Sequence, residues 1–367
     1  MSRALLASGR SGLAPAVLVL LIGCGCREKV DFTDPIPVDD TFERVPATGE
    51  ELARYEDAAA YSEAHRGLAF MVIRGDTVVF ETGQNGHALS EPHHLFSGTK
   101  SFTCALFEAA REDGFITPDE RVRDTLPELD EAAAALTPDD LLHLTSGMRQ
   151  PLRLTLDMLG VSQSIEDKYA YSVDLRWNTA PGEVFDYGPA HFNVFGELVT
   201  RKIGGDPLAY LEQRVLDPIG LRRAGWIRDP AGNPMLSAGA FTTANEWAKY
   251  GVLVRDDGEF LGQRVLPEGA LSGCMQGSVA NPAYGRTWWL NREVDDDVAL
   301  VGGSRLEEEG PILWNDGPDD LVVAAGHDDQ RLYVIPSEDL VIVRLADGGR
   351  GFHDADLLEK ALGARSR

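Results

Sequence analysis

The sequence predicts one α/β domain of the α+β type, in which both ends of the chain build one antiparallel sheet flanked by helices. Strand-like runs gather at residues 68–81 and 287–345, whereas the stretch between them has mostly helical patterns. The chain has 367 residues, 43% of them hydrophobic, which is enough for one large core. We therefore expect an α/β lobe from about residues 47–92 and 285–367 and an inserted, mainly helical lobe at about 93–284. A cleft between the lobes is the natural ligand site.

The first part of the domain is predicted to form a helix followed by two strands. Thr48-Gly49-Glu50-Glu51 fits a capping box and predicts a helix over Leu52–His65. The β-rich runs Leu68–Ile73 and Thr77–Glu81 flank Arg74-Gly75-Asp76, a hairpin signal.

The middle of the chain has helical periodicity and helix-ending glycines. The predicted helices cover residues 97–112, a short stretch from Pro138, and residues 190–202, 207–215 and 243–255. The last third returns to strands at residues 287–290, 332–335 and 340–345, and ends in a helix over 355–362. Trp288 and Trp289 are expected to pack on the sheet, with one ring partly at the site.

Residues 1–23 have the pattern of a secretory signal. Arg3 and Arg10 precede an apolar run from Leu13 to Ile22 that is too short to span a membrane. Leu21-Ile22-Gly23-Cys24 resembles a bacterial lipobox, which implies cleavage before Cys24 and lipidation there; a plain signal with an incidental cysteine is the alternative. We expect residues 24–46 to form an anchor and tether and residues 47–367 one domain. The protein would be exported and held by lipid in the bacterial cell envelope, facing the periplasm.

The charge, the cysteines and the histidines limit the partners, disulfides and metal sites that we expect. A formal net charge of −25 repels phosphate backbones, so we expect no nucleic-acid partner. No CxxC pair occurs, and Cys104 and Cys274 could either form a disulfide or remain two buried thiols. His93-His94 is interpreted as a surface pair, and we expect neither a metal nor a cofactor.

Ser97 and Lys100 carry the strongest chemical signal. Side chains three residues apart lie on one face of a helix, about one turn apart. Burial can depress the pKa of a lysine, so that a neutral amine takes the proton of the hydroxyl. The pair therefore indicates acyl transfer through a serine ester.

Four stretches extend this signal: Phe96–Phe102, Leu141–Met148, Pro181–Tyr187 and Gly326–Gln330. Their order and spacing resemble the β-lactamase-related serine hydrolases, which include penicillin-binding proteins, class C β-lactamases, esterases and 6-aminohexanoate-oligomer hydrolases. The resemblance covers about residues 50–362. It implies a β-lactamase/transpeptidase-like fold and a small-molecule or peptide-like ester or amide as substrate.

The resemblance also implies roles for particular residues. Ser97 would be the nucleophile, and its amide, at a helix N-terminus, would form half of the oxyanion hole. Lys100 would be the general base or would tune one, and Tyr187 would relay protons to the leaving group and from water. For Tyr187 the alternative is a core aromatic residue. His143, in the second stretch, is expected to be structural.

Two departures from the family pattern shift the expected chemistry. The second motif, often Tyr-x-Asn, is Tyr187-Gly188-Pro189 here, and proline offers no side-chain amide to a substrate. In relatives the third motif is Lys-Thr-Gly, His-x-Gly or His-Gly-Gly. Here it is His327-Asp328-Asp329, where Asp329 would add bulk and negative charge.

The second oxyanion N–H is expected from Gln330. We expect an esterase or amidase acting through an acyl-Ser97 intermediate. The alternatives are a penicillin-binding D,D-peptidase or β-lactamase, and a weak or inactive binding protein of the same fold.

Overall fold

The structure, a computed structural model, describes residues 32–160, 162–294, 314, 316–349 and 351–363. The expected signal segment and Cys24 lie outside these residues. Within them, no helix combines the length and apolar character that a membrane span requires.

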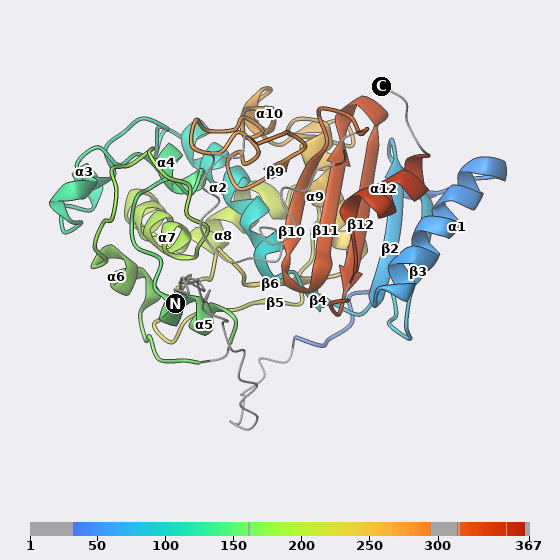
Figure 1. Ribbon diagram of the computed structural model, residues 1–367, viewed down its shortest axis with the longest axis horizontal. Helices are drawn as coiled ribbons and strands as arrows, with labels where there is room; N and C mark the ends of the chain where they lie inside the picture. Colours follow the sequence, from blue (N-terminus) through green and yellow to red (C-terminus); the bar gives the residue numbers. More distant parts are fainter. Residues whose placement is uncertain (1–31, 161, 295–313, 315, 350, 364–367) are drawn as a thin grey trace, which may run out of the picture. The chain divides into compact units, whose positions relative to one another are not determined.

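A seven-stranded sheet contains strands from both ends of the chain (Figure 1). In spatial order it consists of β1 (Glu43–Arg44), β3 (Thr77–Gly83), β2 (Gly67–Arg74), β12 (Leu340–Ala346), β11 (Gln330–Ile335), β10 (Val322–Gly326) and β9 (Trp289–Leu290). Every neighbouring pair is antiparallel except β1 with β3, which makes the sheet mixed. The predicted fold class is confirmed, with this one parallel pair added.

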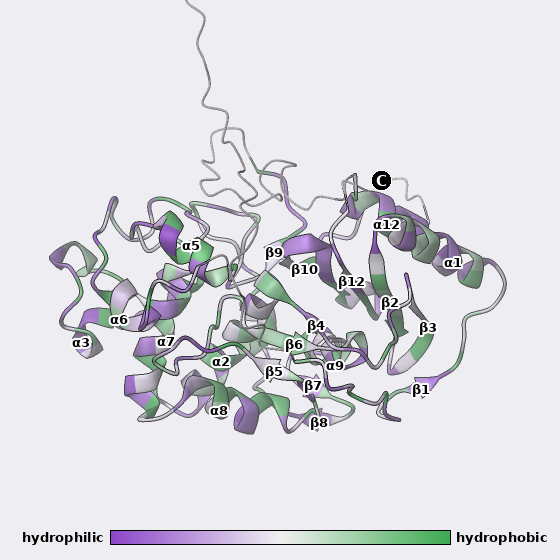
Figure 2. Ribbon diagram, turned by 90° about the horizontal axis from the view of Figure 1, so that it is seen from below, coloured by the Kyte–Doolittle hydropathy of each residue, from purple (hydrophilic) through white to green (hydrophobic). Residues whose placement is uncertain are grey.

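Helices cover both faces of the sheet. Because side chains alternate along a strand, Arg331 and Tyr333 of β11 bond to Asp354 of α12 (Asp354–Leu362), whereas Leu332 faces Gly251 of α9 (Ala244–Arg255). Helix α1 (Gly49–Ala64) lies beside α12 (Figure 2). It begins at Gly49, and the side chain of Thr48 makes no capping bond, so the predicted capping box was wrong.

The chain between the two halves of the sheet is mainly helical. Its α-helices are α2 (Ser101–Glu112), α3 (Val122–Thr125), α4 (Pro138–Leu142), α5 (Leu152–Met158), α6 (Lys168–Val173), α7 (Ala190–Ile203), α8 (Pro207–Leu211), α9 and α10 (Ala270–Gly273). Shorter turns are η1 (Phe96–Lys100), η2 (Glu131–Ala133) and the π-helical η3 (Glu212–Leu216); η4 (His327–Asp329) and η5 (Pro336–Glu338) follow near the C-terminus.

Two small sheets in this insertion were not predicted. One is made of β4 (His93–His94), β6 (Ala240–Thr242) and β5 (Gly225–Trp226), and the other of β7 (Glu259–Phe260) and β8 (Gln263–Arg264). Strand β6 pairs with β4 directly before η1, so it fixes the entry of the chain into that turn.

The described part of the expected tether lies along the domain. Phe42 is buried, and Asp39 accepts a 2.7 Å hydrogen bond from Lys249 of α9. The backbone N–H of Ile36 bonds to the carbonyl of Ser90. Residues 36–42 are therefore held by the domain over this stretch.

Candidate active site

Ser97 lies in a 3₁₀ turn, η1, that leads directly into α2. We expected the first turn of an α-helix here. In a 3₁₀ turn side chains three residues apart eclipse one another, so Lys100 comes directly over Ser97. The Nζ atom of Lys100 lies 2.8 Å from the Ser97 Oγ. Ser97 itself is half-buried, whereas Lys100 is only 2% exposed.

Lys100 is buried without a carboxylate partner. The structure describes five lysines, and Lys168, Lys202, Lys249 and Lys360 each form an ion pair with an acidic residue. Around Lys100 the neighbours are instead the carbonyl of Ser237 at 2.9 Å and the rings of Tyr187 and Phe192, with centroids at 4.9 and 5.3 Å. Burial lowers the pKa of Lys100 from 10.5 to about 7. Near neutral pH a large fraction of this amine is therefore unprotonated and able to accept a proton.

Tyr187 lies beside Lys100 at the edge of an aromatic cluster. Its ring is half-buried and stacks on Trp289 of β9 at 5.9 Å, while Phe185 and Tyr284 are buried behind it. Trp289 thus reaches the site, whereas Trp288 is fully buried against Tyr250. This matches the expectation for the tryptophan pair.

Gln150, from a separate loop, holds the segment that follows Tyr187. Its Oε1 accepts a 3.1 Å hydrogen bond from the backbone N–H of Ala190, the first residue of α7. Its amide packs so closely on Gly188 that a Cβ there would lie 2.2 Å from Oε1. Pro189 supplies no side-chain amide at this turn, and Gln150 supplies one from the other side. No local pattern in the sequence indicates this contact, because the partners are 40 residues apart.

His191 adds a second constraint on the same loop. It is fully buried, and its Nε2 lies 2.7 Å from the carbonyl oxygen of Asp186 and 3.0 Å from Nε2 of Gln150. Burial lowers the pKa of His191 to about 4, so the ring is neutral at neutral pH. The backbone on both sides of Tyr187 is therefore tied to buried groups.

The third motif lies in the tight hairpin between β10 and β11. Asp328 and Asp329 adopt left-handed backbone conformations, with φ of 59° and 63°. Asp329 is buried; its carboxylate accepts a bond from the N–H of Gly349 and lies 3.8 Å from Arg331. The carboxylate of Asp329 is therefore bound within the hairpin, and its expected effect on the substrate stays a prediction.

The same hairpin places Gly326, not Gln330, against the turn of Ser97. A Cβ on Gly326 would lie 2.1 Å from the carbonyl oxygen of Leu95 and 3.1 Å from the nitrogen of Gly98. Gln330 is fully buried, and its side-chain amide bonds to the carbonyls of His327, Asp328 and Ala346. The position that requires glycine is thus Gly326, three residues before Asp329, and His327 is the next residue along the chain.

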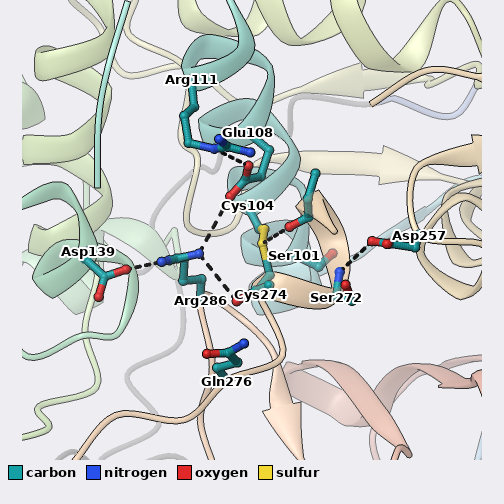
Figure 3. Close-up of a disulfide and its surroundings, with 12 residues drawn as sticks. Ser101, Cys104, Glu108, Arg111, Asp139, Asp257, Ser272, Cys274, Gln276 and Arg286 are labelled. Atoms are coloured by element: carbon teal, nitrogen blue, oxygen red, sulfur yellow. Dashed lines mark hydrogen bonds and ion pairs between the residues drawn. A yellow bond between two sulfur atoms is a disulfide. The ribbon is translucent and has the colours of Figure 1, made fainter. Parts of the chain in front are cut away.

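A disulfide joins the helix after Ser97 to the segment leading to β9. Cys104 of α2 is bonded to Cys274, which follows α10, with Cα atoms 6.4 Å apart (Figure 3). Beside it Arg286 bonds to Asp139 at 2.5 Å and lies 3.6 Å from Glu108. His143 is buried and bonded to the carbonyls of Asp139 and Gln276, which confirms its structural role.

The histidine pair before Ser97 is half-buried, so its interpretation as a surface pair was wrong. His94 packs between the rings of Phe96 and Phe241, at 3.9 and 4.3 Å. The described residues include no cluster of three or more side chains able to hold a metal ion.

Three comparisons place this geometry among known proteins. The profile of the beta-lactamase family matches residues 51–364. The 6-aminohexanoate-dimer hydrolase of Paenarthrobacter ureafaciens is 24% identical over 286 residues, 70% of this chain and 71% of the relative. The structure of a putative 6-aminohexanoate-dimer hydrolase from Bacillus anthracis has a TM-score of 0.69 at 18% identity, covering 90% of this chain and 89% of that one.

A D-stereospecific amidohydrolase from Streptomyces sp. has a TM-score of 0.60 at 15% identity, covering 84% of this chain and 98% of that one. These structural likenesses agree with the β-lactamase/transpeptidase-like fold built above. Because the family profile spans nearly the whole domain, the chain belongs to the beta-lactamase family and is a hydrolase of that family.

Proposed function

We propose that this protein is a serine hydrolase that cleaves an ester or amide through an acyl-Ser97 intermediate. The observation that carries the proposal is the 2.8 Å contact between Lys100 Nζ and Ser97 Oγ, made by a buried lysine that has no carboxylate partner within the described part of the chain. The similarity to a 6-aminohexanoate-dimer hydrolase, to a putative second one and to an amidohydrolase supports an amide or ester as the substrate class.

In the proposed reaction Lys100 and Tyr187 move protons. The neutral Lys100 amine takes the hydroxyl proton as Ser97 Oγ attacks the carbonyl carbon. Tyr187, whose ring lies 4.9 Å from Lys100 Nζ, relays that proton to the leaving alcohol or amine as the bond to carbon breaks. Water then attacks the carbonyl carbon of the ester and loses a proton to the same pair. The pair gives that proton to Ser97 Oγ as the bond from carbon to Oγ breaks, which releases the acid and restores the free serine.

Two backbone amides would stabilise the oxyanion. One belongs to Ser97, whose position at the start of η1 leaves its N–H without a partner in that turn. For the second we now favour His327 over Gln330, because Gly326 brings the end of β10 into contact with η1. One such donor typically contributes about 3 kcal/mol to the transition state.

Labelling with a fluorophosphonate probe tests the nucleophile. Wild type should become labelled, and Ser97→Ala should not. Ser101→Ala is the matched control, since Ser101 lies one turn further along and bonds to the Gly98 carbonyl. Equal labelling of Ser97→Ala and wild type, or no labelling of wild type, would count against the proposal and favour a binding protein.

A fluorescent penicillin distinguishes the penicillin-recognising alternative. We expect no adduct, because Pro189 offers no side-chain amide to the lactam. An adduct on Ser97 at low probe concentration would instead support a D,D-peptidase or β-lactamase.

The proposal also places the enzyme outside the cytoplasm, held by lipid at Cys24. The lipobox-like sequence and the Cys104–Cys274 disulfide support export to an oxidising compartment. Wild type expressed in a bacterium should fractionate with membranes and incorporate labelled palmitate. Cys24→Ala should do neither, and palmitate incorporation into that variant would refute the anchor.

A further inference from the structure

Aromatic rings from four separate segments form a continuous row that ends beside Ser97. We call Phe32, Phe241, His94, Phe96 and His327 the aromatic row. Successive centroids are 5.0, 4.3, 3.9 and 5.5 Å apart, within the range of direct ring contact. Every ring is partly exposed, and the side chain of His327 is 51% exposed. The row is therefore half-buried along most of its length and reaches solvent at His327.

Phe96 holds its place in the row at a conformational cost. Its backbone has a φ of +47°, a left-handed conformation that is rare for a bulky residue and costs roughly 1–2 kcal/mol. Glycine would adopt the same turn without this strain. The ring is half-buried, so it gains only part of the burial energy that a core phenylalanine gains. Packing of the ring therefore offsets the backbone strain of Phe96 only in part. Strain of this kind gathers at functional sites.

The two ends of the row differ. Phe32 covers Phe241 and fits against Gly225, where a Cβ would lie 2.0 Å from the Phe32 ring. At the opposite end His327 and Phe96 flank the turn of Ser97. Phe96 and His327 are thus the rings of the row that lie nearest to the turn of Ser97.

Charges around the row disfavour an anionic group. Burial lowers the pKa of His94 to about 4, so this ring is uncharged at neutral pH. The carboxylate of Asp328 lies 3.4 Å from Nε2 of His327 and would repel an anion there. The protein as a whole has a net charge of −25.

Resting on the proposed function, we propose that the aromatic row binds the acyl side of the substrate and selects a neutral aryl-bearing acyl group. The two backbone amides proposed for the oxyanion hole belong to Ser97, next to Phe96, and to His327. A carbonyl held by these amides therefore has the two rings beside it. The leaving group needs the proton delivered by Tyr187, so it lies toward Tyr187 and the acyl group lies toward the row.

The test compares acyl groups that share one leaving group. The 4-nitrophenyl esters of acetate and 3-phenylpropionate are hydrolysed by wild type, Phe96→Gly and Phe241→Ala. The readout is the ratio of the two kcat/KM values, in which any general loss of reactivity at Ser97 cancels. Phe115→Ala is the control, since Phe115 is an exposed ring that packs on Tyr210, outside the row.

Wild type should prefer the phenylpropionyl ester by at least about tenfold, and Phe96→Gly should lower that preference about threefold to tenfold. Phe241→Ala should lower it less, and Phe115→Ala should leave it unchanged. An unchanged ratio in Phe96→Gly overturns the inference. The inference is also overturned if Phe96→Gly alters the selectivity of the enzyme only when the leaving group of acetyl esters is varied, and not when the acyl group is varied. Failure of the proposed function has a different signature, because then neither ester is cleaved and the fluorophosphonate does not label Ser97.

Discussion

The pKa of Lys100 is the property on which the proposed chemistry most depends. The amine is 2% exposed and has no carboxylate partner among the described residues, so burial acts on it without compensation. We expect the rate at which a fluorophosphonate acylates Ser97 to follow the neutral fraction of this amine. The perturbation is pH, varied from 5 to 9 on the wild-type protein.

The expected size of the effect follows from the shift. With a pKa of about 7, half of the amine is neutral at pH 7, against about one part in 3,000 at the ordinary value of 10.5. The labelling rate should therefore rise about a hundredfold from pH 5 and level off near pH 9. A lysine with an ordinary pKa would give a rate that still climbs tenfold per pH unit at pH 9.

Quenched-flow labelling followed by in-gel fluorescence measures these rates. One other group near the site titrates in the same range, because burial raises the pKa of Asp186 to about 6. Asp186→Asn should therefore keep the midpoint near 7. A wild-type rate without a plateau by pH 9 would refute the reasoning. So would a Lys100→Ala variant that keeps both the rate and the midpoint.

Three further predictions follow from the same contacts. Lys100→Met should abolish labelling yet raise the free energy of unfolding by of order 3–5 kcal/mol at pH 6. The reason is that Lys100 binds its proton below about pH 7 in the folded state but below about pH 10.5 in the unfolded state, so at pH 6 the lysine destabilises the fold. That gain should fade toward pH 10.5, and urea titrations at pH 6 and pH 10 that show equal gains would contradict it. Gln150→Ala should lower kcat about fivefold to tenfold with little change in KM, since it removes one hydrogen bond that holds the Tyr187 loop; steady-state kinetics on a neutral ester measure both constants. Cys274→Ser should lower the free energy of unfolding by about 2–5 kcal/mol in urea, and reduced wild type should behave alike, whereas equal midpoints for reduced and oxidised wild type would argue against the disulfide.

Local patterns allowed the fold class and the serine-lysine pair to be predicted. The spacing of Ser97 and Lys100 needs only one helical turn to bring them together, and a 3₁₀ turn serves as well as an α-turn. The sheet strands β2, β11 and β12 are long apolar runs at the two ends of the domain, so hydrophobic patterning identified them. Strand β10 was missed because Val322–Gly326 is a five-residue apolar run that could equally be buried helix.

The parts that could not be predicted depend on contacts between distant segments. Gln150 reaches Ala190 across 40 residues, and no local spacing indicates such a bond. The burial of Asp329 depends on two consecutive left-handed residues and on Gly349 and Arg331, which a motif comparison does not contain.

Both departures from the family motifs lie beside contacts that the motifs do not include. Pro189 removes an amide from the second motif, and Gln150 presents one to the same loop from another segment. Asp329 replaces a glycine at the third motif, yet the position where a Cβ is excluded by the turn of Ser97 is Gly326, and glycine is retained there. Comparing motif letters position by position does not reveal these contacts, because each joins segments that are distant in the sequence. Pro189 still leaves no side-chain amide at its own position, and that loss is why we favour esters and amides over lactams.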